Sequence, residues 1–420
     1  MPAALSREAL PKWIRMKRLC FVFALLLCFQ VCAVAQKKVI DQARTLLKTG
    51  KEGELARAEK LMTDLLRDSA NQGKVKIWLT LTEVVRKQYE LGNEKLYLKQ
   101  KIDTASLFAT ARKMFAVYEA LDSIDALPDK KGRVVLHYRS KNQDFLHPFR
   151  PNLYKGGMFF TRKNDFAKAW DLFDAYVDCA SQPLFSGMDY LNSDSLMPNA
   201  AFMSLYTGYR LKDKAKMTKY LPLALQDTVH LDNTYRYLAE TYVAEGDTAQ
   251  YLDVLQKGFD RYPNNPFFFP RLIDYLNSQG LADSANVVID RACAVDSTNV
   301  IFLFAKSSSL LNAGRDEECI AVTQRLIALN DSMPEAYCNL GLAYYNQAVS
   351  IDRNMQRSRK KRRTMQDLYA KSLPYMEKFR AMAPDQQSKW VPALYNIYLN
   401  LNMGKEFEEI DMLYKKLSKP

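Results

Sequence analysis

The sequence is poor in the residues that carry most enzyme chemistry. Only three of its 420 residues are histidines, His137, His147 and His230, and none has a metal-ligand partner at helical spacing. GxSxG, HExxH, a glycine-rich phosphate loop and a cysteine–histidine pairing are all absent. We therefore expect no catalysis, no cofactor and no metal. An enzyme would require an insertion at residues 126–150 to fold over a groove and bring His137 or His147 against a carboxylate.

Cysteine is also scarce, and no CxxC pattern occurs. Three of the seven cysteines lie in the first 35 residues, so four remain in the rest of the chain: Cys179, Cys293, Cys319 and Cys338. This number excludes a disulfide-rich scaffold. A Cys319–Cys338 disulfide is conceivable, but we expect two buried thiols instead.

The excess of basic over acidic residues is concentrated in two segments. The formal net charge is +13, but residues 1–35 carry five basic residues and one acidic residue, so +9 remains beyond them. Residues 353–363 contain seven basic residues and no acidic one, and the rest of the molecule is therefore nearly neutral. We expect no nucleic-acid partner, because a broad basic surface is missing.

The N-terminal segment has the order of an export signal. From Met16 it shows a basic start, an apolar stretch over Leu19–Phe29 and a small-x-small end at residues 33–35. We expect translation from Met16, cleavage before Gln36, and an exported protein in the periplasm or envelope. The alternative is an uncleaved N-terminal membrane anchor, since residues 19–35 reach the lower edge of spanning length.

Glycine is infrequent, but three glycines recur at intervals of 34 residues. Gly246, Gly280 and Gly314 stand where a first helix must stop and turn. Large apolar residues recur at the fourth and eleventh positions, and a second apolar set follows at helical spacing. Each unit is thus predicted to be two short amphipathic helices that must stack on their neighbours. The clearest units begin at Asp232, Pro266, Val300 and Pro334.

These units resemble tetratricopeptide repeats. The last of them carries Leu340, Gly341 and Tyr344 in "PEAYCNLGLAYYNQ", and Pro384 closes it. The resemblance implies an all-α, right-handed superhelical solenoid of about nine antiparallel helix pairs. The expected organisation is a signal peptide (1–35), degenerate N-terminal repeats with a long insertion (36–149), further repeats (150–231), four repeats (232–384) and a C-terminal capping helix pair (385–420).

A basic run interrupts the fourth of these repeats. An insertion at about residues 350–366 separates, or extends, its two helices. Two interpretations stay open: a solvated extension, or a tether to a membrane or another anionic surface. Nuclear targeting is incompatible with export. The basic residues are Arg353, Arg357, Arg359, Lys360, Lys361, Arg362 and Arg363.

The resemblance also implies a concave binding face on the first helices. Its polar and aromatic character suits an extended peptide. We therefore expect a non-catalytic scaffold or adaptor that binds a protein or peptide partner in the bacterial envelope. The alternative is a glycan- or peptide-binding accessory of an uptake or degradation system. The implied residues are Arg236, Tyr237, Glu240, Arg271, Asp274, Asn277, Ser308, Asn312, Asn339, Tyr345 and Asn346.

Overall fold

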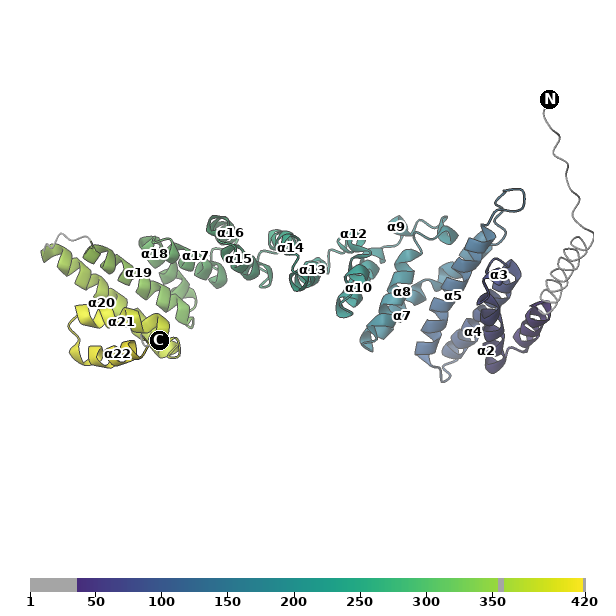
Figure 1. The fold of residues 1–420 in the computed structure, drawn as a ribbon, viewed down its shortest axis with the longest axis horizontal. Coiled ribbons are helices and arrows are strands. Elements are labelled where there is room, and N and C mark those ends of the chain that lie inside the picture. The colour runs from purple at the N-terminus through teal and green to yellow at the C-terminus, as the bar shows by residue number, and fades with distance from the viewer. Residues whose placement is uncertain (1–35, 354–358, 418–420) are drawn as a thin grey trace, which may run out of the picture. The chain divides into compact units, whose positions relative to one another are not determined.

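The computed structural model describes residues 36–353 and 359–417, and every regular element in these ranges is a helix (Figure 1). Consecutive helices pack as antiparallel pairs, which confirms the predicted all-α class of stacked helix pairs. Within the described ranges, no helix combines the length and apolarity needed to cross a membrane. The predicted export signal lies outside the described residues.

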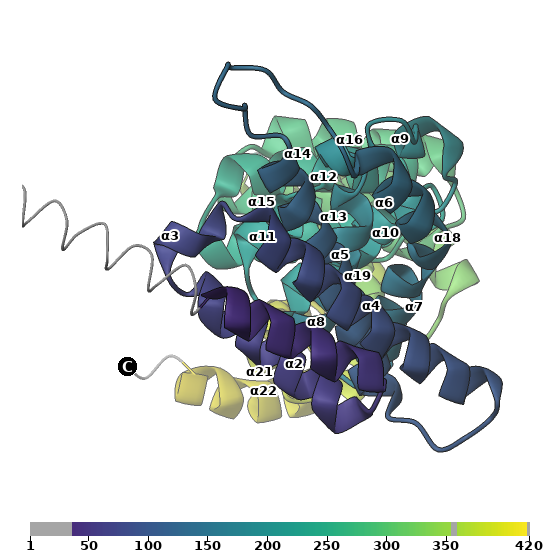
Figure 2. The same cartoon turned by 90° about the vertical axis from the view of Figure 1, so that its right-hand side faces the viewer.

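The chain divides into two compact units, Met1–Tyr237 and Leu238–Pro420. In the first unit α2, α4 and α5 pack in sequence (Figure 2), as do α7, α8 and α10. The elements there are a helical stretch over residues 36–49, α2 (Glu52–Leu66), α3 (Ser69–Gln72), α4 (Val75–Tyr97), α5 (Thr104–Asp125), α6 (Arg139–Leu146), α7 (Pro151–Arg162), α8 (Phe166–Asp178), α9 (Tyr190–Ser193), α10 (Met197–Arg210), α11 (Lys214–Thr218) and α12 (Leu221–Ala224).

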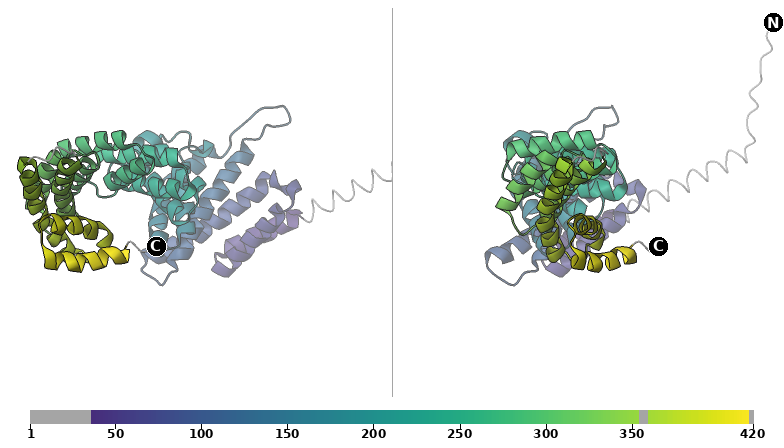
Figure 3. Two further views of the ribbon diagram at one scale, coloured as in Figure 1. Left: turned by 60° about the vertical axis from the view of Figure 1, so that its left-hand side comes forward. Right: turned by 90° about the vertical axis from the view of Figure 1, so that its left-hand side faces the viewer.

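Helix α13 (Leu231–Glu245) spans the division between the units. The second unit continues with α14 (Thr248–Arg261), α15 (Phe268–Ser278), α16 (Ala282–Val295), α17 (Val300–Asn312), α18 (Asp316–Leu329), α19 (Pro334–Arg353), α20 (Arg359–Met382), α21 (Gln387–Asn400) and α22 (Gly404–Leu417). Figure 3 shows the helices at the yellow end of the chain packed together, and α19 pairs with α20 as α21 does with α22. Trp390, Leu394 and Ile397 on α21 are buried in their shared core.

The predicted glycine turns are present at each position. Gly246, Gly280 and Gly314 have φ values of 74°, 70° and 69°, a left-handed conformation that glycine adopts without steric cost. After each glycine, the next backbone N–H donates to a carbonyl five residues back and so ends the first helix. These bonds are Asp247 to Tyr242, Leu281 to Leu276 and Arg315 to Leu310, each 2.9 Å.

The same turn occurs earlier in the chain without glycine. Asn164 (φ 59°) and Lys212 (φ 55°) occupy the fifteenth position of units that begin at Arg150 and Pro198. The N–H groups of Asp165 and Asp213 donate to Phe160 and Gly208, each at 3.0 Å. The turn geometry therefore extends backwards, but the step of 34 reaches only to Lys212, because Asn164 lies 48 residues before it.

The repeat that contains the basic run has unusually long helices. Ala348, where the register would place a turn, is buried inside α19. Helix α19 has 20 residues and α20 has 24, against 13 and 14 in α17 and α18. The inserted residues thus extend both helices, and Arg359–Arg363 form the exposed first turns of α20.

Candidate functional site

A cavity of about 490 Å³ lies between α15, α16 and α17 in the second unit. Four of the residues expected on the concave face line it: Asp274 and Asn277 on α15, and Ser308 and Asn312 on α17. Its floor is apolar, and its volume falls within the range of pockets that hold a small ligand or a few side chains. The apolar lining includes Phe269, Ile273, Ala285, Ile289, Ile301, Phe304 and Ala305.

The amphipathic pattern of α15 places its polar residues at the rim. Leu272, Ile273 and Leu276 are buried, whereas Asp274 and Asn277 lie one turn apart on the exposed side. The side-chain amides of Asn277 and Asn312 form no hydrogen bond with any residue of the described ranges, so both are available to a ligand.

The rim is acidic, because the lining includes two carboxylates and no cation. Asp274 on α15 and Asp283 in the first turn of α16 have no ion-pair partner among residues 36–353 and 359–417. Lys306, next to the lining residue Ala305, is already paired with Asp290. Lys306 is therefore not available to neutralise the two carboxylates that line the cavity.

Arg271 also lies apart from the cavity. Its Nη1 donates to the Phe267 carbonyl at 3.1 Å, and its guanidinium lies 4.0 Å from the centre of the Phe267 ring. This arrangement holds the side chain over the loop before α15. Phe268, in contrast, is fully buried and packs where a Cβ on Gly258 would be only 2.4 Å from its ring.

Three further residues of the expected face connect repeats to each other. Asn339 is only 9% exposed, and its Nδ2 donates to Ser307 Oγ and Ser308 Oγ, both at 3.0 Å. The Tyr345 hydroxyl accepts from Asn396 Nδ2 at 2.9 Å, and Asn346 Nδ2 donates to Asp316 at 3.4 Å. Burial raises the pKa of Asp316, only partly opposed by this bond. These side chains stabilise the stack.

In the first unit, Arg236 and Tyr237 belong to a cluster of tyrosines and arginines. Tyr237 stacks on Tyr209 with ring centres 4.5 Å apart and lies 5.6 Å from Tyr206. Arg210 donates to the Tyr206 hydroxyl at 2.8 Å, and the Arg236 guanidinium lies 5.0 Å from the Tyr237 ring centre. Guanidinium groups and neighbouring rings thus cover these aromatic faces. Glu240 is half-buried in the second unit.

Sequence reasoning missed Tyr206, Tyr209 and Arg210. They occupy positions nine, twelve and thirteen of the unit that begins at Pro198, which are positions that the resemblance assigns to the concave face. The sequence predicts site residues only in the units from Asp232 onward. Applying it one unit earlier would have identified all three.

The histidines contribute to local structure in the described ranges. His137 Nδ1 lies 3.1 Å from Asp125 Oδ1, and Asp125 Oδ2 also accepts the backbone N–H groups of His137 and Tyr138. Arg139 donates two bonds to Asp122, so both aspartates fix the base of the 126–138 loop. His137 thus does contact a carboxylate, as an enzyme would require. The same carboxylate also accepts two backbone N–H groups, so the contact serves to hold the loop.

The other two histidines have equally local partners. His147 Nδ1 lies 3.0 Å from the Tyr190 hydroxyl, and His230 Nδ1 lies 2.9 Å from Asp227 Oδ2. Burial opposes ionisation of Asp227, but hydrogen bonds from His230 and Asn199 outweigh it and lower its pKa. Residues 36–353 and 359–417 contain no cluster of three side chains suited to hold a metal ion.

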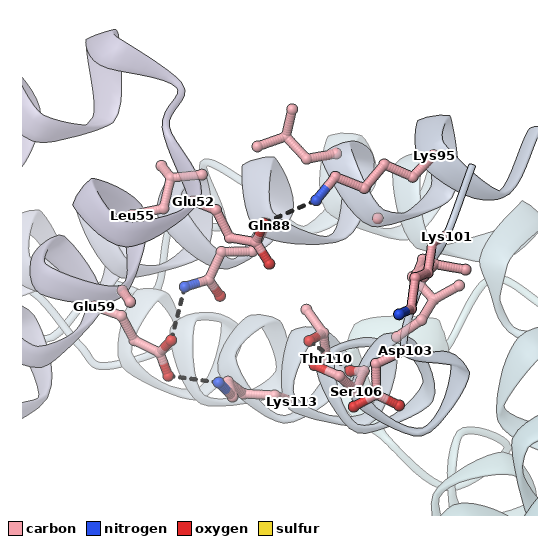
Figure 4. Close-up of a pocket in the computed structure, with 15 residues that line it drawn as sticks. Glu52, Leu55, Glu59, Gln88, Lys95, Lys101, Asp103, Ser106, Thr110 and Lys113 are labelled. Atoms are coloured by element: carbon pink, nitrogen blue, oxygen red, sulfur yellow. Dashed lines mark hydrogen bonds and ion pairs between the residues drawn. The ribbon is translucent and has the colours of Figure 1, made fainter. Parts of the chain in front are cut away.

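A second cavity, of about 380 Å³, lies between α2, α4 and α5 (Figure 4). Four of its charged residues pair with each other: Lys95 with Glu52 at 2.8 Å, and Lys113 with Glu59 at 2.6 Å. Gln88 also donates to Glu59 at 2.8 Å. These bonds cross the cavity between helices, and they make it a polar junction within the stack.

Cys319 and Cys338 are free, buried thiols. Burial raises the pKa of both, that of Cys338 to about 11. Cys319 lies in a small polar cluster in which Ser307 Oγ and Thr323 Oγ1 are 2.6 Å apart. Neither thiol therefore has the low pKa of a reactive cysteine.

No family model matches the sequence, and no curated protein does. Several solved structures are similar in fold. They include the MamA protein (20% identity, 45% of this chain and 91% of that chain, TM-score 0.32), the C-terminal part of a TPR repeat-containing protein from Cytophaga hutchinsonii (12%, 61% and 92%, 0.39), and yeast Tom70 (10%, 92% and 98%, 0.25). The likenesses concern helical-repeat architecture and extend to no partner or activity.

Proposed function

We propose that this protein is a non-catalytic scaffold that binds a segment of a partner protein in the cavity between α15, α16 and α17. One observation carries the proposal: the unoccupied rim amides of Asn277 and Asn312 flank an apolar floor. Polar groups with no internal partner above apolar surface are typical of a recognition site. They contrast with Asn339, whose amide connects two repeats.

A photo-crosslinking amino acid at residue 277 or 312 tests this function in cells. We expect the same partner to be captured from both positions and lost when Ala305→Trp fills the cavity. The matched control is residue 385, which is exposed in the loop before α21 and lies outside the cavity. Equal capture from residue 385, or capture that survives Ala305→Trp, would contradict the proposal.

We further propose that the scaffold works in the bacterial cell envelope. The support is the export-signal pattern from Met16 to residue 35, which lies outside the described residues. N-terminal sequencing of the protein from fractionated cells should begin at Gln36. A start upstream of Leu19 in the membrane fraction would favour the anchor instead.

The alternative is a glycan- or peptide-binding accessory of an uptake or degradation system, and glycan binding has the weaker structural basis. Glycan sites present open aromatic faces, whereas the aromatic lining of the second-unit cavity consists of Phe269 and Phe304, and Phe269 is buried. In the first unit, Arg236 and Tyr209 cover Tyr237. The geometry therefore favours a protein segment as ligand.

The exposed basic residues Arg359–Arg363 support a peripheral contact with an anionic surface as a second proposal. They occupy a helix N-terminus with no acidic residue in its first turn, where the helix dipole disfavours positive charge. An anionic surface would relieve this repulsion. Arg353 ends α19, and Arg357 lies outside the described residues, so the described part of the proposed contact is Arg359–Arg363.

A further inference from the structure

The cavity between α15, α16 and α17 also indicates which kind of segment it accepts. We infer that its ligand is an extended peptide with an apolar side chain next to a lysine or arginine, and this inference rests on the function proposed above. Three features carry it: the apolar lining, the two amides on different helices, and the carboxylates without an ion pair in the described ranges.

The rim amides favour an extended backbone. Asn277 lies on α15 and Asn312 on α17, so the two amides face the cavity from different helices. An asparagine amide both donates and accepts, which matches the N–H and C=O groups of a peptide. An extended chain exposes these groups along its edges, whereas a helix satisfies its own. A helical ligand could pair the amides only through its side chains.

The floor favours an apolar anchor. Ile273, Ile289 and Phe304 approach the cavity from three different helices. A leucine-sized side chain that enters between them removes apolar surface of both partners from water. A wholly polar peptide would leave this floor in contact with water and gain nothing from it.

The carboxylates favour a cationic neighbour. Asp274 and Asp283 line the cavity without an ion pair in the described ranges, and no cation lines it. Lys306 is held by Asp290, and Arg271 is held on Phe267. An acidic segment would therefore meet only like charge, whereas a lysine or arginine beside the anchor finds two acceptors.

Three synthetic nine-residue peptides test the inference against the protein as cells produce it. They share a central leucine and differ in the flanking residues, which are lysine, glutamine or glutamate. Fluorescence anisotropy should show at least tenfold tighter binding of the lysine peptide than of the glutamate peptide. In Asp274→Asn/Asp283→Asn this preference should fall at least fivefold. Asp385→Asn, which removes an exposed carboxylate elsewhere in the unit, should keep it.

Two cavity-filling variants separate this inference from the underlying function. Ala305→Trp acts at the floor, and Asn312→Trp acts at the exposed rim, where a change in folding is least expected. If both tryptophan variants lose all peptide binding, the cavity is the binding site and the scaffold function stands. If the Asp274→Asn/Asp283→Asn variant then keeps the full preference for lysine, the charge inference is overturned. Absence of binding by every peptide to the unaltered protein would overturn this inference, whereas the scaffold function stands or falls with the crosslinking at residues 277 and 312.

Discussion

Gly208 on α10 lies so close to the backbone of Met217 on α11 that a Cβ at residue 208 would be 2.5 Å from the Met217 nitrogen. No rotation of a side chain can relieve that contact, because the obstructing atoms belong to the main chain. The helices of this pair therefore touch at glycine, as Gly157 does against the Phe173 ring in the preceding pair.

Gly208→Ala should consequently destabilise the protein by about 2 kcal/mol or more, since the added methyl must push two helices apart. Gly53→Ala is the matched control, because a Cβ at residue 53 meets no atom within 4 Å and lies in α2. There the change should be neutral or slightly stabilising. Chemical denaturation followed by circular dichroism measures both, and equal losses would refute the backbone contact.

At the fifteenth repeat position, removing and introducing glycine should change the free energy of unfolding in opposite directions. Gly280→Ala should cost about 1 kcal/mol, because alanine resists the φ of 70° and nothing else lies near. Lys212→Gly, at φ 55°, should instead gain stability of similar size. The midpoints of urea unfolding should shift in opposite directions, and shifts of the same sign would contradict the turn geometry.

Glu119 predicts a pH-dependent stability. Burial raises its pKa to about 7, with Arg112 opposing and Asp174 and Asp178 reinforcing the shift. The folded state then binds more protons than the unfolded state between pH 4.5 and 7, so stability falls as pH rises through this window. The loss should reach at most about 3 kcal/mol. Denaturant unfolding at pH 5 and pH 8 measures this loss of stability. In Glu119→Gln the contribution of residue 119 should be absent, and a loss equal to that of the unaltered protein would contradict the assignment.

Cys319 and Cys338 should resist alkylation in the native protein. Cys319 and Cys338 are buried, and the raised pKa values keep them protonated at neutral pH. Alkylation of the native protein should label the half-buried Cys293 first and these two only after unfolding. Masses of the unfolded, alkylated protein should not depend on a reductant; a two-thiol difference would reveal a disulfide.

The basic turns of α20 predict lipid binding that depends on salt. Replacing Arg359, Lys360, Lys361, Arg362 and Arg363 by glutamine should weaken binding to vesicles of anionic lipid at low salt at least tenfold, at about 1 kcal/mol per residue. The fold should stay intact, since all five are exposed. Neutral vesicles are the control. Equal binding by both proteins would exclude the tether.

The fold could be predicted from the sequence because the apolar residues that recur every 34 positions are the ones that pack between helices. Spacing alone located the turns at Gly246, Gly280 and Gly314. The resemblance assigned Asp274, Asn277, Ser308 and Asn312 to the concave face, and all four line one cavity; that they bind a partner stays a prediction.

Spacing could not show how individual polar side chains are used. Arg271 and Asn339 stand at expected positions, yet one lies over Phe267 and the other bridges α17 and α19. Such outcomes depend on rotamers and on residues far away in the sequence. The lack of a turn at Ala348 was likewise hidden, because an inserted segment can extend helices or separate them.

The 126–138 loop offers a practical entry point. Its base is held by Asp122 and Asp125, and Asp129 accepts from the Lys131 and Arg133 backbone to close its tip. The tip is exposed, and a Cβ at Gly132 would meet no atom within 4 Å. An epitope or fluorophore sequence inserted there would leave both chain ends native, and the partner could then be followed in living cells.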